Sequence, residues 1–265
     1  MSRITRVEVV DFPSASESDR ARALESAAAL VASAFDGPGL AGFCAGLRAG
    51  AFHFYQMGLY YDQAELVGFS AYTLDPMEGE EQGLAARAIT VLRPAWRGAR
   101  RTALFWIRTM STLLWRHRGV PLWIFNPAQH VASYRFLAKH LRGMVPHPDR
   151  APTDEEIARV ARLAAQFHYT RLPTDHPLSC RRTIWLRAAQ RTPPPGGRPR
   201  DAFDETFEAL NPANHEGGCV LTLGRLTLLS ILGTLAQVPL HLARDWLRRQ
   251  LPAQANDLAA RATRS

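Results

Sequence analysis

The chain has 265 residues, of which 46% are hydrophobic and 21% charged, a composition typical of folded globular proteins that excludes general disorder. The formal charge is +8 and the isoelectric point about 10.1, but Lys139 is the only lysine and no basic run interleaves with aromatic residues. The sequence therefore offers no base-stacking platform, and nucleic acid is not expected as a partner.

The first hundred residues predict one strand, then a helix, then three further strands. Ile4–Phe12 predicts a strand, and Ser16 or Ser18 can cap a helix that runs to about Phe35. Three β-rich runs follow, at Phe52–Tyr61, Glu65–Leu74 and Ala85–Leu92. Polar connections between these runs suit hairpins, so we expect an antiparallel meander.

The third run leads through a turn into an apolar helix over about 101–118. A short buried strand, Pro121–Phe125, comes next, and a helix then runs from Asn126-Pro127 to about Leu141. A strand, a helix and a strand beside the first make a βαβ crossover. The predicted fold class is therefore α/β, with a mixed, mostly antiparallel sheet that contains one such crossover.

The composition shifts toward helix after residue 150. Thr153 and Glu156 form a capping box, residues 181–187 could be another strand, and 192–199 is a proline-rich loop or linker. We expect a core domain over residues 1–150 and a mainly helical C-terminal extension over residues 151–265.

The three cysteines and the N-terminus bear on the compartment. Cys44, Cys180 and Cys219 form no pair at metal-ligand or redox spacing, so they are expected to be small, apolar, buried residues in a reducing compartment. The first twelve residues lack the apolar stretch of a signal peptide. These features predict a cytoplasmic protein.

The turn between the third run and the apolar helix carries the clearest functional signal. Its sequence, RPAWRGARR, places unpaired backbone N–H groups at a helix start, where the helix dipole also favours an anion. Gly98 allows a close backbone approach, and Arg97, Arg100 and Arg101 would add contacts to phosphate oxygens. Alternatively, Gly98 only shapes the turn and the arginines are solvated.

This turn and the segments after it resemble the GNAT superfamily of acyltransferases between about residues 50 and 142. The matching pieces are Val91–Gly98, Asn126–Ala128 and Ser133–Leu137. The family's phosphate loop usually reads Gln or Arg, two residues, Gly, one residue, then Gly or Ala. Here Ala95 and Arg100 stand at the first and last places, so only Gly98 matches.

The resemblance implies acyl transfer from acyl-CoA or, given the altered loop, from the phosphopantetheine thioester of an acyl carrier protein, with no metal. The acceptor would be a small-molecule amine that attacks directly. The implied cofactor-binding residues are Ile89 and Val91 through their backbone, the loop residues Arg97, Gly98, Ala99, Arg100 and Arg101, and Asn126 at the end of its strand.

Two residues are candidates for proton transfer. Tyr134 stands where the family places a general acid, and the pKa of a phenol, about 10, suits protonation of a departing thiolate. Its helical spacing from Val131 and Leu137 equally fits a core tyrosine. Glu81 could act as the general base, although it belongs to a cluster with Glu78 and Glu80 that could simply be a solvated turn.

Other reaction classes have no motif in the sequence. No His-Glu-x-x-His, Gly-x-Ser-x-Gly or P-loop pattern occurs, which argues against a metalloprotease, a serine hydrolase or an NTPase. The rival to an N-acyltransferase is a non-catalytic ligand-binding or protein-binding module with the same fold.

The uncharged stretch Leu226–Ala243 bears on membrane association. Its polar residues and Pro239 argue against a membrane span, so a buried core helix is expected first. The alternative is an interfacial helix in which Leu240, Trp246 and Leu247 share one face and arginines project elsewhere. That helix would make the protein peripheral at the inner membrane face.

Overall fold

The computed structural model describes residues 3–78, 83–96, 100–170, 176–187, 200–212 and 217–235. The strands are β1 (Arg6–Asp11), β2 (Phe35–Asp36), β3 (Phe54–Asp62), β4 (Glu65–Pro76), β5 (Leu84–Leu92), β6 (Leu122–Ala128), β7 (Arg142–Val145), β8 (Ser179–Arg181), β9 (Trp185–Leu186) and β10 (Gly218–Leu226). The helices are α1 (Glu17–Ala34), α2 (Leu40–Arg48), the 3-10 turn η1 (Pro94–Trp96), α3 (Arg100–Arg116), α4 (Val131–His140), α5 (Asp154–Gln166), α7 (Ala202–Leu210) and α8 (Leu228–Leu235).

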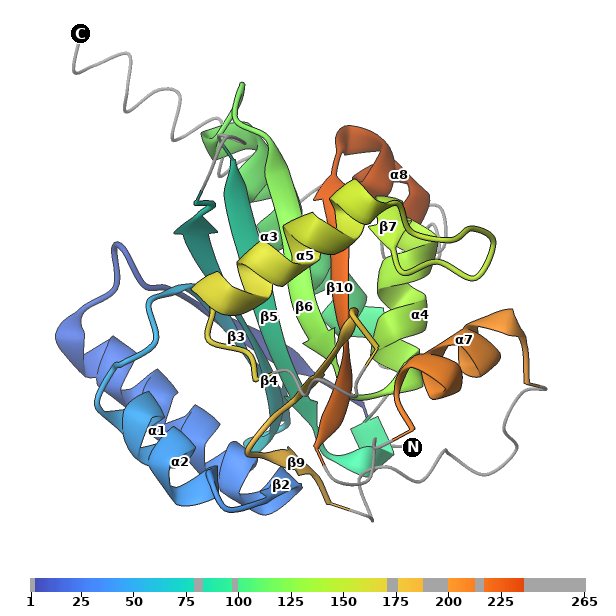
Figure 1. Ribbon diagram of the computed structural model, residues 1–265. Coiled ribbons are helices and arrows are strands. Elements are labelled where there is room, and N and C mark those ends of the chain that lie inside the picture. The colour runs from blue at the N-terminus through green and yellow to red at the C-terminus, as the bar shows by residue number, and fades with distance from the viewer. Residues whose placement is uncertain are drawn as a thin grey trace, which may run out of the picture.

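The main sheet has the order β1-β3-β4-β5-β6-β10-β7 (Figure 1), and β8 pairs with β10 outside this path. The pairs from β1 to β5 are antiparallel, which confirms the predicted meander. β5 and β6 are parallel and joined through α3, which confirms the predicted crossover. The predicted fold class, a mixed and mostly antiparallel sheet with helices and one βαβ crossover, is therefore confirmed.

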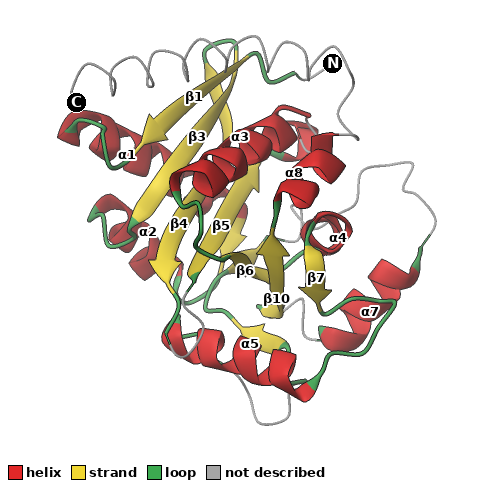
Figure 2. Ribbon diagram, turned by 90° about the horizontal axis from the view of Figure 1, so that it is seen from above, coloured by secondary structure: helices red, strands yellow, loops and turns green. Residues whose placement is uncertain are grey.

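Helices cover both faces of this sheet (Figure 2). On one face, α1 and α2 pack over the meander, and α5 packs over β6 and β10. On the other face, α3, α4 and α8 pack over the sheet, and α7 packs on α4. This layering follows from side-chain alternation, because successive residues of a strand point to opposite faces and both faces here are apolar.

Local sequence signals set several helix starts as expected. The side chain of Ser16, rather than Ser18, caps α1 by accepting the backbone N–H of Asp19 at 3.1 Å. Thr153 and Glu156 form both hydrogen bonds of a capping box at the start of α5. These bonds satisfy N–H groups that a helix leaves without partners in its first turn.

The residues after 150 contribute more to the core than a helical extension would. β10 lies between β6 and β7 in the sheet and is buried apart from Arg225. A short, continuously apolar run cannot be distinguished from a buried helix by its periodicity, which is why the sequence did not reveal this strand. Within the expected strand at 181–187, only Arg181, as the end of β8, and β9 are extended.

The uncharged C-terminal stretch is described only as far as Leu235. In α8, Ile231 and Thr234 are buried, whereas Leu228, Leu229 and Leu232 are more than half exposed. The alternative interfacial helix falls on residues outside the described part of the chain. Among the described residues, no helix combines the length and the apolar character needed to cross a bilayer.

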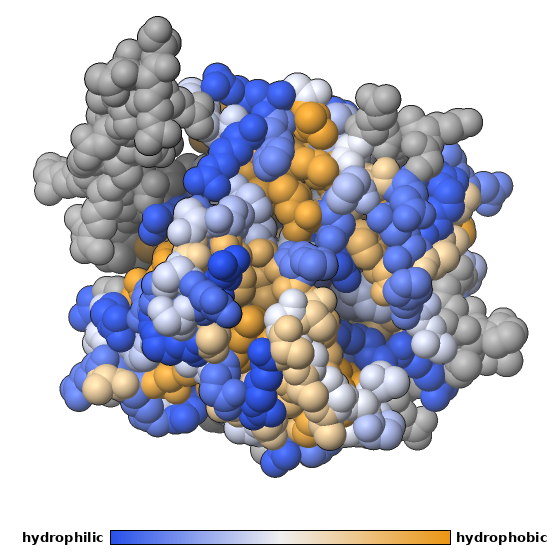
Figure 3. Space-filling view, turned by 90° about the vertical axis from the view of Figure 1, so that its left-hand side faces the viewer, coloured by the Kyte–Doolittle hydropathy of each residue, from blue (hydrophilic) through white to orange (hydrophobic). Residues whose placement is uncertain are grey.

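The surface on the side shown in Figure 3 is mixed. Hydrophobic side chains form separate patches between hydrophilic areas on this face. Scattered exposed apolar residues are normal for a folded protein, so these patches alone mark no interface.

Candidate functional site

The parallel strands β5 and β6 stay paired only at their beginning. Their register covers Leu84 with Leu122, Ala85 with Trp123 and Ala86 with Ile124. Beyond these pairs β5 continues to Leu92 and β6 to Ala128 without pairing to each other. The carboxyl halves of the two strands therefore diverge, and we call the gap between them the β5–β6 opening.

Backbone hydrogen bonds show which residues of β5 face this opening. The N–H of Leu84 donates to the carbonyl of Pro121 at 2.9 Å, and the N–H of Ala88 donates to Oδ1 of Asn126 at 3.0 Å. Both donors point toward β6. Because backbone groups alternate in direction along a strand, the backbone of Thr90 also points toward β6, into the opening. No hydrogen bond joins Thr90 to β6 within the described residues.

The odd-numbered residues of β5 face the other neighbour. Ile89 and Val91 lie opposite Ala71 and Phe69 of β4, and the N–H of Arg93 beyond them donates to a β4 carbonyl. The backbone groups of Ile89 and Val91 are thus directed at β4 and not at the opening. Of these β5 residues, Ala88 and Thr90 direct their backbone groups at the opening, so a donor lying in the opening would meet Thr90 rather than Ile89 or Val91, and the expected backbone contact itself stays a prediction.

Asn126 braces the opening from the β6 side. Its Oδ1 accepts the Ala88 N–H, while its own backbone carbonyl accepts the hydroxyl of Thr222 at 2.7 Å. Thr222 is fully buried in β10. The side chain predicted to contact a carrier thus links β5 to β6, and Thr222 ties that position to β10. Thr222 was missed because nothing in the local sequence relates it to a residue almost a hundred positions earlier.

The predicted phosphate loop is only partly described. Arg97, Gly98 and Ala99 lie outside the described residues, and Arg100 and Arg101 open α3 without a description of their side chains. The turn before them is anchored to the meander. Trp96 Nε1 donates to Asp62 Oδ2 at 3.0 Å, and the Arg93 guanidinium pairs with Glu65. These contacts hold the start of α3 next to the carboxyl end of β5.

Tyr134 lies in the core and not on a surface. Its side chain is 0% exposed, and its hydroxyl donates to the carbonyl of Pro146 at 3.3 Å. The rings of Phe203 and Phe207 pack against it, with centroids 6.4 and 5.9 Å away. Burial raises the pKa of the Tyr134 phenol well above its usual value, and the nearby charge of Asp149 adds to this effect. This arrangement favours the packing role over the acid role.

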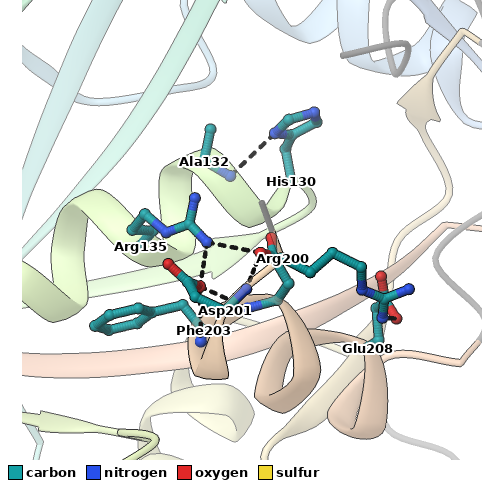
Figure 4. Close-up of polar contacts among 8 residues, drawn as sticks. His130, Ala132, Arg135, Arg200, Asp201, Phe203 and Glu208 are labelled. Atoms are coloured by element: carbon teal, nitrogen blue, oxygen red, sulfur yellow. Dashed lines mark hydrogen bonds and ion pairs between the residues drawn. The ribbon is translucent and has the colours of Figure 1, made fainter. Parts of the chain in front are cut away.

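Helix α7, which supplies both phenylalanines, is fixed to α4 by an ion-pair cluster (Figure 4). One guanidinium nitrogen of Arg135 lies 2.5 Å from Asp201 Oδ1 and 2.9 Å from Asp204 Oδ2. Asp201 also caps α7 by accepting the Phe203 N–H at 3.1 Å. The two aromatic rings that pack on Tyr134 therefore come from α7, which lies outside the segments that resemble the GNAT superfamily.

His130 lies at the edge of the sheet that the opening faces. It follows β6 and caps α4, with Nδ1 accepting the Ala132 N–H at 3.1 Å (Figure 4). Because β5 and β6 are parallel, their carboxyl ends meet at this edge. The sequence alone gave this histidine no role.

The acidic hairpin before β5 lies at the opposite end of the strand. Glu80 and Glu81 fall outside the described residues, whereas Glu78 is exposed and its N–H donates to Gln166 at 3.2 Å. Gly83 closes the hairpin just before β5, and the strand rises about 3.3 Å per residue, so Thr90 is roughly 20 Å further along. The described residues around Glu81 thus give no support for a base at the opening.

A surface pocket of about 400 Å³ lies elsewhere on the sheet. Trp123, Arg142, Arg159 and Arg225 are among its lining residues. Trp123 pairs with the beginning of β5, so the pocket is at the opposite end of β6 from the β5–β6 opening. Among the described residues, no cluster of three or more His, Cys, Asp or Glu side chains could hold a metal ion.

Comparisons with known proteins gave matches only among solved structures. No family model matches the sequence, and neither does any curated protein. The similar structures include a GNAT-family N-acetyltransferase, a GCN5-related N-acetyltransferase and other acetyltransferases.

Three of these structures illustrate the level of similarity. The Escherichia coli N-acetyltransferase YhbS, solved in complex with CoA, is 13% identical, with 85% of this chain and 83% of that one covered and a TM-score of 0.38. Escherichia coli ElaA is 13% identical over 56% of this chain and 93% of its own, with a TM-score of 0.34. A Trypanosoma brucei acetyltransferase is 20% identical over 56% and 99%, with a TM-score of 0.34.

Proposed function

We propose that the protein is an acyltransferase that moves an acyl group from a pantetheine thioester to a small-molecule amine. The observation that best supports this proposal is the β5–β6 opening. There the backbone N–H and C=O of Thr90 face β6 without forming a hydrogen bond to a strand among the described residues. A pantetheine arm contains amide groups and can pair with such an edge as an added strand would. The turn that follows β5 leads to the N-terminus of α3, where phosphate groups would be favoured.

The reaction would be a direct transfer. The amine nitrogen attacks the thioester carbonyl, the carbon–sulfur bond breaks, and the proton lost by the amine ends on the departing thiolate. Tyr134 as the proton donor stays a prediction, and it requires the phenol to be uncovered from Phe203 and Phe207. Glu81 as the base also stays a prediction.

The donor is either acyl-CoA or an acyl carrier protein. Both donors are retained because Arg100 stands at the last place of the loop, where the GNAT superfamily usually has Gly or Ala. Calorimetric titration with acetyl-CoA, a long-chain acyl-CoA and an acylated carrier protein separates these donors. Thiol release measured over a panel of amines then tests the transfer. We expect binding of at least one donor and thiol release that depends on an amine, and absence of binding by all donors would refute the proposal.

A non-catalytic binding module is the second candidate. Two observations favour it, because each concerns a candidate for proton transfer. Phe207 of α7 packs on Tyr134, and the described part of the acidic hairpin lies at the far end of β5 from the opening. Donor binding without thiol release in every mixture would support this second function over the first.

Membrane association is a separate part of the proposal. Leu228, Leu229 and Leu232 of α8 are exposed, and the sequence continues into the arginine-rich segment 244–264. Pelleting of the full chain with anionic vesicles tests this association against a chain shortened after Ala243. Equal pelleting of both chains, or none by the full chain, would remove it.

A further inference from the structure

Two of the three cysteines lie opposite each other on paired strands. Cys180 of β8 and Cys219 of β10 are direct partners in the antiparallel register, and their sulfur atoms are 2.6 Å apart. Both are buried, with 1% and 0% of their surface exposed. All three cysteines are buried, as expected, and strand pairing brings Cys180 and Cys219 together although they are far apart in the sequence.

The geometry suits a covalent bond without movement of the backbone. Directly opposite residues of antiparallel strands have Cα atoms about 4.5–5.5 Å apart, which falls within the range of about 4.4–6.8 Å found for disulfides. The thiols already point at each other, at a separation only about 0.5 Å longer than a sulfur–sulfur bond. Rotation of the two side chains is therefore enough to form the bond.

We propose that Cys180 and Cys219 form a disulfide when the protein meets a small disulfide oxidant such as oxidised glutathione. One cysteine thiolate attacks the oxidant, giving a mixed disulfide and releasing one glutathione thiolate. The second cysteine then attacks the protein sulfur of that mixed disulfide and releases the other glutathione. Both cysteines are oxidised and lose their protons, and one oxidised glutathione is reduced to two thiols.

The disulfide would link β8 to β10, the strand that carries Thr222 next to the proposed donor site. β8 belongs to the segment between β7 and β10, and its cross-link to β10 would fix that segment to the sheet. Cys219 lies three residues before Thr222, whose hydroxyl holds the carbonyl of Asn126 at the β5–β6 opening. The cross-link would therefore secure the same strand that supports the opening.

Cys44 provides an internal control. It lies in α2, in the hydrophobic cluster on the meander side, and its thiol faces the carbonyl of Ala28 at 3.7 Å. Cys180 and Cys219 belong to the different cluster under α5. A specific oxidation should leave Cys44 as a thiol.

The test uses the full chain and its Cys44→Ser variant in defined mixtures of reduced and oxidised glutathione. We expect the native protein to keep one free thiol after oxidation, an intact mass lower by two hydrogens, and a Cys180–Cys219 linked peptide in a non-reducing digest. The variant should keep none. Closing this loop should raise Tm by roughly 4–16 °C relative to the reduced protein.

A second experiment tests whether the oxidant can reach the buried pair of cysteines. The oxidation is repeated in urea below the unfolding midpoint, where local opening of a short strand such as β8 becomes more frequent. Three free thiols in both arms, stable glutathione adducts on Cys180 or Cys219, or a linkage that includes Cys44 would overturn the proposal.

Discussion

Asn126 and Ala88 are joined across the β5–β6 opening by a hydrogen bond of 3.0 Å from the Ala88 N–H to the side-chain oxygen of Asn126. This bond replaces the ladder bond that β6 would have supplied had the two strands stayed together. The opening is thus a supported feature of the sheet, since Asn126 is itself held by Thr222.

Thr222→Val should destabilise the protein by about 1 kcal/mol. The two side chains have similar shapes, but valine leaves the Asn126 carbonyl without the hydroxyl that it accepts at 2.7 Å. Urea unfolding with an unchanged m-value measures this loss. Thr222→Ser is the matched control, because it keeps the hydroxyl and removes only a methyl group. Greater stability of the valine variant than of the serine variant would contradict the bracing role.

Thr90→Pro should weaken binding of a pantetheine donor by roughly 2- to 10-fold, since it removes one N–H that faces the opening. The ladder to β4 should survive, because Thr90 does not donate to β4. Thr90→Ala is the control, since both variants lose the hydroxyl contact with Ser70 at 2.8 Å but alanine keeps the N–H. Calorimetric titration with acetyl-CoA measures the difference, and equal affinities of the two variants would place the donor elsewhere.

Tyr134→Phe should leave turnover within about 2-fold of the native value and cost about 0.5–1.5 kcal/mol of stability. The reason is that the hydroxyl is buried and donates to the Pro146 carbonyl. Steady-state kinetics and urea unfolding on the same preparation measure the two effects. A fall in kcat of about 100-fold with unchanged donor affinity would instead support Tyr134 as the proton donor, which would require the phenol to be uncovered during turnover.

Stability should fall as the pH rises above about 10. Burial raises the pKa values of Tyr60, Tyr72, Tyr134 and Tyr169 in the folded protein, whereas the unfolded chain ionises its tyrosines near pH 10. The stability from keeping these phenols neutral is complete below pH 10 and is lost above it, by up to about 1.4 kcal/mol per pH unit for each tyrosine. Urea midpoints between about pH 8 and pH 11 measure the slope. Tyr134→Phe should reduce it, and an equal slope would contradict the assigned shift.

Arg225→Gln should raise Tm slightly at low salt. Arg225 and Arg142 are direct partners on β10 and β7, and neither forms an ion pair among the described residues. Opposed like charges cost roughly 0.2–1 kcal/mol, and the low end applies here because both side chains are exposed. Thermal unfolding at low and high salt measures the effect, which salt should abolish. Arg225→Lys keeps the charge and should show no gain, and a gain for both variants would assign the effect to packing.

Local signals in the sequence were sufficient for much of the fold. The three β-rich runs with polar turns predicted the meander, and the order of strand, helix and strand predicted the crossover. The capping box of Thr153 and Glu156 fixed the start of α5. Each of these features depends on residues close together in the chain, so no knowledge of distant partners was needed.

Tertiary structure decided everything that depends on a distant partner. Whether the run from Gly218 to Leu226 is a strand was settled by the space between β6 and β7. The neighbouring strands also determine that Thr90 faces the opening while Ile89 and Val91 face β4. The sequence gives the alternation along a strand, but only pairing says which side meets which neighbour.

The same distinction applies to the candidate site. The sequence by itself selected Asn126 and Tyr134 as residues of interest and showed three cysteines. The fold then bound Asn126 to Ala88, buried Tyr134 under α7 and placed Cys180 against Cys219. Residue type determines what chemistry a side chain can perform, whereas its burial and its hydrogen-bond partner depend on long-range contacts that no local pattern contains.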